Sequence, residues 1–175
     1  MADAMEFESL VARFYEPLYQ FAFSLTRAEA DACDLTQQTF TVWATKGHQL
    51  RDISKVKTWL FTTLHREFLE SRRRQTRFPH FDLDTAESEL PAISPAAVSR
   101  LDTAQVLDAL KRVDEVYQAP VALFYLQDCS YLEIAEILKV PLGTVKSRLT
   151  RGIAQLQQLL ARDIAAGQTP PPPNL

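Results

Sequence analysis

The stretch "EIAEILKVPLGTVKSRLTRG", residues 133–152, contains two helical patterns separated by a proline-containing turn. Apolar residues recur at three- and four-residue intervals on both sides of the turn. Ser130 followed by Glu133 fits a capping box, which predicts where the first helix begins. Pro141 cannot extend that helix, but its fixed φ suits the entry to the next one. The stretch therefore predicts a helix-turn-helix.

The second of these helices has an apolar stripe and an acid-free polar surface. Val145 and Leu149 lie on the stripe and should face the core. The predicted outward positions are Thr144, Lys146, Ser147, Arg148, Thr150 and Arg151. Such a surface can contact phosphates and base edges in the DNA major groove, although a merely solvated basic face is the simpler alternative.

Charge is distributed unevenly along the 175 residues, whose formal net charge is -3. Residues 51–77 hold eight basic and three acidic side chains, and residues 137–162 hold five basic and none acidic, so each region has a net charge of +5. Residues 1–47 and 78–115 are acidic, with net charges of -4 and -5. Two basic regions in an acidic chain favour local phosphate contact, which the overall charge conceals.

Helical periodicity dominates the rest of the chain and predicts an all-α fold of two small domains. The first, residues 1–77, should be a three- to four-helix bundle, with Pro17 either kinking or starting a helix. Residues 78–100 form an acidic, proline-containing stretch that predicts a flexible linker. Residues 101–164 should form the helix-turn-helix bundle, and residues 165–175 a disordered proline-rich tail.

Two further helices are predicted in the first domain, over residues 29–45 and 55–74. In the second domain the helical period runs from residue 101 with breaks near residues 127–130 and 140–141. Trp59 is interpreted as a core anchor for the loop that precedes it.

Several functional classes find no support in the sequence. Cys33 and Cys129 stand alone and predict buried small side chains, not a metal site or disulfide framework. The three histidines do not have metal-ligand spacing, and no phosphate-binding glycine loop or nucleophile motif occurs. We therefore expect no enzyme activity, cofactor or small-molecule substrate. Without a membrane-length apolar run or a secretory signal pattern, a cytoplasmic location is expected.

Three motifs resemble those of one protein family. "YLEIAEILKVPLGTVKSRLTRG", residues 131–152, resembles the C-terminal DNA-binding domain of RNA polymerase sigma factors of the extracytoplasmic-function (ECF) group. "DACDLTQQTFTVWA", residues 31–44, resembles the family's polymerase-binding helix. "KVKTWLFTTLHREFLESRRR", residues 55–74, resembles its minus-ten-binding helix. The resemblance covers about residues 6–77 and 103–161, in the family's order.

The resemblance implies a transcription initiation factor that binds core RNA polymerase and directs it to promoter DNA. It also implies an anti-sigma factor as a partner, and we expect a monomer when no partner is bound. Core polymerase would meet Asp34, Gln37 and Gln38. The minus-ten element would meet Leu50, Arg51, Asp52, Ser54, Lys55, Thr62, Arg66 and Arg73. The minus-thirty-five element would meet the six outward residues of the second helix of the helix-turn-helix.

The sequence departs from the family pattern at three positions that bear on promoter choice. Gln38 stands where the family usually has Glu, Arg66 where Asn is common, and Glu70 where Asp is frequent. A stand-alone helix-turn-helix regulator is the alternative function. It would account for residues 103–161 but would leave the motifs of the first domain without a role.

Overall fold

The computed structural model describes residues 2–75 and 103–167, with side chains from residue 7 onward, and every regular element in these ranges is a helix. The predicted all-α class is therefore confirmed. The predicted linker and most of the predicted tail lie outside the described residues. The first range contains α1 (Ala2–Thr26), α2 (Glu29–Lys46), the short 3-10 helices η1 (Gly47–Gln49) and η2 (Ile53–Lys55), and α3 (Val56–Gln75). The second contains α4 (Thr103–Leu110), α5 (Glu115–Gln127), α6 (Tyr131–Leu138) and α7 (Leu142–Gly167).

The N-terminal helices pack around an aromatic and leucine core. Leu18 and Phe21 of α1 and Leu60 and Phe61 of α3 are completely buried, and the rings of Phe21 and Phe61 lie 5.5 Å apart. Burying large apolar side chains is the main stabilising term for such a bundle. Pro17 lies inside α1, so it does not start a helix.

The C-terminal helices begin with a break that the periodicity did not predict. A single helix was expected from residue 101 to about 127, but the chain turns between α4 and α5. The buried side chain of Gln118 donates to the carbonyl oxygens of Leu110 (3.2 Å) and Val113 (3.0 Å), which lie at and beyond the end of α4. Because Gln118 satisfies these carbonyls, the turn replaces continued helix without leaving them unpaired.

Helix α7 continues to Gly167, three residues past the predicted end of the helical domain at residue 164. It crosses α5 at Gly152, where an added Cβ would lie 2.5 Å from Val121 Cγ2 and 2.8 Å from Tyr117 Cβ. Only a residue without a side chain allows the two helices to approach this closely. Glycine inside a helix-favouring stretch was the available sequence signal for this contact.

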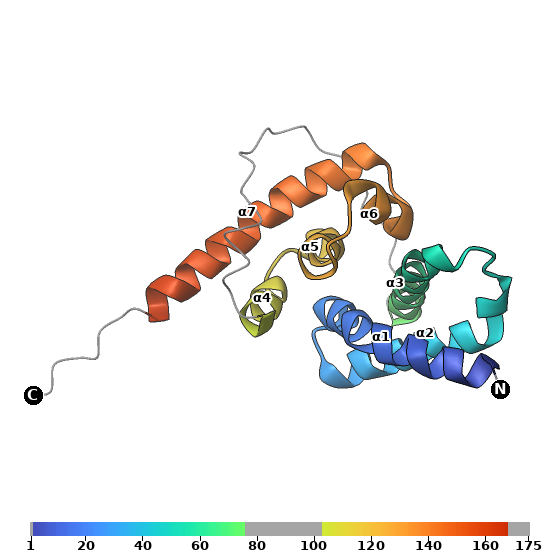
Figure 1. Cartoon of the computed structure of the whole chain (residues 1–175). Coiled ribbons are helices and arrows are strands. Elements are labelled where there is room, and N and C mark those ends of the chain that lie inside the picture. The colour runs from blue at the N-terminus through green and yellow to red at the C-terminus, as the bar shows by residue number, and fades with distance from the viewer. Residues whose placement is uncertain (1, 76–102, 168–175) are drawn as a thin grey trace, which may run out of the picture.

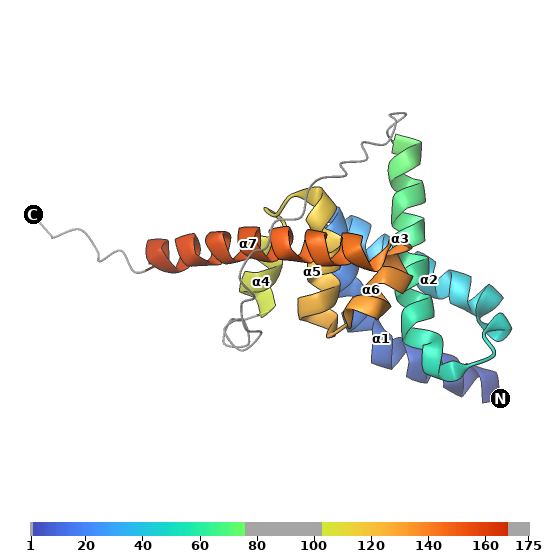
Figure 2. The same ribbon diagram turned by 90° about the horizontal axis from the view of Figure 1, so that it is seen from above.

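The two sets of helices lie against each other, α1 beside α5 and α3 beside α6 (Figures 1 and 2). Lys57 Nζ donates to the Gln127 carbonyl oxygen at 2.7 Å, and Gln127 Nε2 donates to the Pro17 carbonyl oxygen at 3.1 Å. Arg72 of α3 forms an ion pair with Glu115 of α5. The faces of α3 are therefore divided between a side toward α2 and a side toward α6.

Candidate nucleic-acid interface

The helix-turn-helix is formed by α6 and α7, as the sequence predicts. Ser130 Oγ accepts from the Glu133 amide at 3.2 Å while Glu133 Oε2 accepts from the Ser130 amide at 2.7 Å, which completes the capping box. Helix α6 ends at Leu138, and its C-cap residue, Lys139, has a left-handed φ of 58°. This C-cap, followed by Pro141, turns the chain sharply into α7.

The N-terminal part of α7 presents its polar residues around a buried stripe. Val145 and Leu149 are 0% and 1% exposed, so the predicted inner face is confirmed. Lys146 is exposed. The half-buried members of the predicted outward set are Thr144, Ser147, Arg148, Thr150 and Arg151. The Thr150 hydroxyl donates to the Lys146 carbonyl oxygen at 2.8 Å, so it is partly used within the helix.

Arg148 does not face open solvent as expected but interacts electrostatically with His65 of α3. Burial, together with a smaller effect of the positive charge of Arg148, lowers the pKa of His65 to about 4. His65 is therefore neutral at physiological pH. No local pattern predicts that these residues, 83 positions apart in the chain, lie close enough to interact.

The loop before α3 is basic and largely exposed. Arg51, Asp52, Ser54 and Lys55 are exposed, whereas Leu50 is half-buried. Asp52 Oδ1 accepts from the Ser54 amide (3.0 Å) and hydroxyl (2.7 Å), and these bonds lower the pKa of the Asp52 carboxyl. Asp52 therefore caps η2 and shapes the loop, a role that its predicted contact with the minus-ten element did not include.

Two tryptophans fix the position of this loop. The rings of Trp43 in α2 and Trp59 in α3 meet edge to face with centroids 5.1 Å apart. Gly47 lies directly over the Trp43 ring, where an added Cβ would be 2.5 Å from Cδ2. Trp59 packs against the core as predicted, but its partner Trp43 and the need for Gly47 were not predicted.

A hollow of about 470 Å³ lies between α3 and α6. Its α3 side includes Thr62, His65 and Arg66, and its α6 side includes Glu136 and Lys139. Four of the predicted minus-ten residues, Leu50, Lys55, Thr62 and Arg66, therefore line a recess that the helix-turn-helix borders. Arg73, also predicted for this surface, is exposed near the far end of α3.

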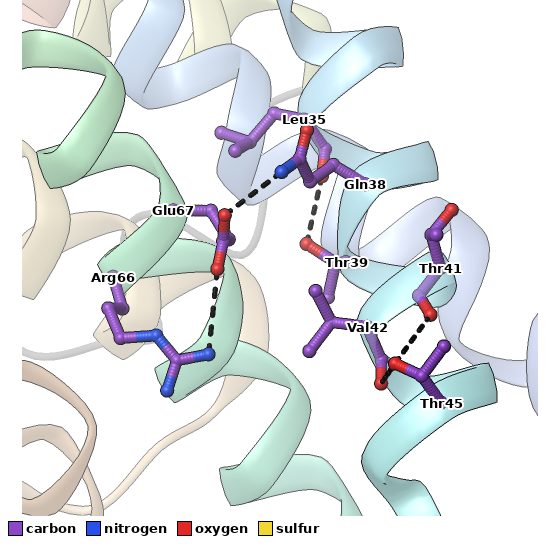
Figure 3. Close-up of polar contacts among 8 residues, drawn as sticks. All are labelled: Leu35, Gln38, Thr39, Thr41, Val42, Thr45, Arg66 and Glu67. Carbon is purple, nitrogen blue, oxygen red and sulfur yellow. Dashed lines mark hydrogen bonds and ion pairs between the residues drawn. The ribbon is translucent and has the colours of Figure 1, made fainter. Parts of the chain in front are cut away.

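The other side of α3 faces α2. Asp34, Gln37 and Gln38 are exposed on α2, as the sequence predicts. Gln38 Nε2 donates to Glu67 Oε2 at 3.0 Å, and Glu67 Oε1 lies 3.5 Å from Arg66 Nη2 (Figure 3). Glu67 was not among the predicted site residues, because nothing in the helical pattern distinguishes it from a solvated acid.

Neither a metal centre nor a membrane span is found in the described part of the chain. In residues 2–75 and 103–167, no group of three or more His, Cys, Asp or Glu side chains could hold a metal ion. None of the helices described combines the length and apolar character needed to cross a bilayer. Cys129 is buried, and that burial raises the pKa of its thiol to about 11. Cys33 is half-buried, so the prediction of two buried cysteines holds fully only for Cys129.

Two family models match the chain in succession. The model for sigma-70 region 2 matches residues 10–78, which include α2 and α3. The model for sigma-70 region 4 matches residues 103–156, which include the helix-turn-helix. The match therefore covers both of the regions that carry the candidate contacts.

Relatives and solved structures agree with this assignment. The ECF RNA polymerase sigma factor SigE of Mycolicibacterium smegmatis is 32% identical over 160 residues, which cover 89% of this chain and 62% of SigE. RNA polymerase sigma factor NccH of Alcaligenes xylosoxydans xylosoxydans is 32% identical over 170 residues, covering 90% of this chain and 88% of NccH. The sigma factor RpoE of Bartonella quintana, solved with the anti-sigma factor NepR, is 31% identical with a TM-score of 0.67, covering 90% and 98%. The chain therefore belongs to the sigma-70 family of RNA polymerase sigma factors, in its ECF group.

Proposed function

We infer that the chain is a transcription initiation factor that binds core RNA polymerase and directs it to specific promoters. The observation that supports this most directly is the presence in one chain of a region 2-type helix pair and a region 4-type helix-turn-helix. A stand-alone regulator would use only the second of these. The chemistry of RNA synthesis belongs to the polymerase, so this chain needs no catalytic residues, and its place of action would be the cytoplasm.

The polymerase contact is assigned to the exposed side of α2. Asp34, Gln37 and Gln38 are exposed there and come from one face of the helix. A hollow of about 430 Å³ beside them is bordered by Asp31 of α2 and Glu70 of α3. The α2 side of this hollow carries acidic and amide groups, while Arg72 and Arg74 line its α3 side. The α2 side therefore suits contact with a basic or amide-rich protein surface more than contact with phosphates.

The promoter contacts are assigned to α7 and to the loop and outer side of α3. Lys146 and Arg151 supply positive charge on the helix that follows the turn, the position from which a recognition helix reads the major groove. The minus-ten contact would use the five predicted loop residues and Arg73 near the end of α3, together with Thr62 and Arg66, which line the hollow. An unpaired base needs both stacking and polar partners to offset its unstacking, and the half-buried Trp59 lies beside these side chains.

An anti-sigma factor is a further proposed partner. RpoE, which shares 31% of its residues with this chain, was solved in complex with the anti-sigma factor NepR. A similar protein would act on this chain by competing for the faces just assigned.

The decisive experiment is run-off transcription with purified core polymerase on a promoter library. The wild-type chain should give transcripts from a subset of promoters, while core polymerase alone should not. Asp34→Arg reverses a charge on the proposed polymerase face and should weaken binding to core polymerase in a pull-down. Glu8→Arg, an equal charge reversal at an exposed position of α1, is the matched control. Transcription that needs no added chain, or equal binding by both variants, would contradict the proposal.

A further inference from the structure

We propose that Glu67 is a positioning residue that orients Arg66 toward minus-ten DNA, and that Gln38 is the neutral partner that makes this arrangement possible. The proposal rests on the proposed function, because it concerns how this chain selects promoters. It adds one residue, Glu67, to the promoter-reading machinery and gives a joint role to two others.

The Glu67 carboxylate lies between two helices and uses both of its oxygens. Oε2 accepts from Gln38 Nε2 of α2 at 3.0 Å, and Oε1 lies 3.5 Å from Arg66 Nη2 (Figure 3). The Glu67 side chain is only 15% exposed, whereas that of Arg66 is 51% exposed. The carboxylate is thus held in place from the α2 side, while the guanidinium that it contacts extends toward solvent.

The charges of the three groups account for the choice of glutamine at position 38. An amide can donate to a carboxylate, but a carboxylate cannot. The Gln38 Nε2 to Glu67 Oε2 hydrogen bond is 3.0 Å long. A glutamate at position 38 would bring a second negative charge to this distance from Glu67, and the two like charges would repel. Gln38 and Arg66 are two of the three departures from the family pattern, and both contact the same carboxylate.

An exposed ion pair of this kind contributes little to folding stability. Its physical effect is on orientation, since it restricts the many rotamers of a long arginine side chain to those near the Glu67 carboxylate. Arg66 approaches Glu67 through Nη2, and a guanidinium has five N–H donors in all. The remaining donors can address a base edge. The carboxylate also lowers the net positive charge beside them, which disfavours a simple phosphate contact.

The test compares base preference at the minus-ten element in run-off transcription with core polymerase on a library randomised there. Glu67→Gln keeps the size of the side chain and removes its charge. We expect it to reduce preference at the same base position as Arg66→Ala, by roughly two- to fivefold, the size that exposed ion pairs carry. Preference at the minus-thirty-five element should not change. Gln38→Glu should have a similar effect, because it repels the carboxylate that holds Arg66.

The double variant Glu67→Gln with Arg66→Ala shows whether Glu67 acts through Arg66. Its minus-ten profile should equal that of Arg66→Ala alone, since coupled residues are not additive. Glu8→Gln is the matched control, because it removes the same charge at an exposed position of α1 that lies outside the proposed contacts. An unchanged profile for Glu67→Gln or for Arg66→Ala, or full additivity in the double variant, would overturn the proposal. Those outcomes, obtained with a wild-type chain that supports transcription, would leave the proposed function intact. A wild-type chain that does not support transcription would instead contradict the proposed function itself.

Discussion

The N-terminal part of α7 and the outer side of α3 are both basic, but the fold treats them differently. Lys146 of α7 is exposed beside the turn. None of the described α7 residues lines the hollow between α3 and α6. On α3, Thr62, His65 and Arg66 line a recess whose opposite wall belongs to α6. The comparison shows that a basic surface predicted from sequence can be open or partly covered, and that tertiary packing decides which.

This difference gives the two proposed DNA contacts different requirements. On the α7 surface, Lys146 is open to a duplex in the conformation described, whereas Arg148 interacts with His65 of α3. The α3 surface can admit a base into its recess only if α6 moves away or if the base enters from the open side. Gln127, at the end of α5 and four residues before α6, is held by Lys57 of α3 and by the Pro17 carbonyl oxygen of α1, and these contacts oppose that movement.

The largest expected effect comes from disturbing the packing of α7, which carries the open surface, against α5. Gly152→Ala would place a Cβ within 2.5 Å of Val121 and 2.8 Å of Tyr117, forcing α7 away from α5. Overpacking of this kind costs about 1–3 kcal/mol, more than the helix propensity gained from alanine. Urea denaturation should show the loss. Gly143→Ala in the same helix, where no atom lies within 4 Å of the added Cβ, should show none. Equal stabilities would contradict the close approach of α5 and α7.

The second prediction concerns base reading by the open surface. Arg151→Ala should reduce discrimination at one or two minus-thirty-five positions, because a base-contacting arginine carries about 1–3 kcal/mol of specificity. Base preference at the minus-ten element provides an internal control and should be unchanged. The measurement is transcription from a library randomised at both elements. A uniform loss over all promoters would mean that Arg151 contacts only phosphate.

A smaller effect is expected from weakening the contacts that keep α6 over the recess of α3. Gln127→Met removes the donor to the Pro17 carbonyl oxygen while keeping a side chain of similar length in an 8% exposed position. Losing a hydrogen bond that contributes about 1 kcal/mol should raise the population of molecules in which α6 has moved away from α3 roughly fivefold. Binding of a single-stranded minus-ten oligonucleotide, followed by fluorescence anisotropy, should tighten by up to that factor.

The control for this variant is Gln20→Met, because Gln20 donates to Glu16 within α1 and joins no two helices. It should leave oligonucleotide binding as in the wild type. If Gln127→Met also binds as the wild type does, α6 does not restrict access to α3.

The last prediction concerns the pH dependence of folding stability at the covered recess, which His65 lines. Burial lowers the pKa of His65 from 6.5 to about 4, so the folded arrangement binds this proton less readily than the unfolded chain does. The stability that neutral His65 supports is complete above pH 6.5 and is lost as the pH falls toward 4. His65→Gln should therefore show a smaller loss of unfolding free energy between pH 7 and 5 than the wild type. Identical losses would show that His65 is not held neutral.

The sequence predicted most of the elements and much of the candidate site. The capping box at Ser130, the turn at Pro141 and the helices close to 29–45 and 55–74 all appear where local patterns place them. These features depend on contacts within a few residues, which a local pattern records. The break between α4 and α5 escaped prediction because Gln118, a residue with ordinary helix propensity, satisfies the carbonyls that the turn frees.

The sequence by itself determined the helical class, the helix-turn-helix, the two basic regions and the family motifs, since each is written in residue type and short-range spacing. The tertiary structure alone decided that Arg148 meets His65, that α6 borders the recess of α3, and that Gln38 and Arg66 share the carboxylate of Glu67. Gln38 and Glu67 are 29 residues apart, and Arg148 and His65 are 83 apart. Contacts over such separations depend on how the helices pack, and helical periodicity specifies which face is buried but not which helix covers it.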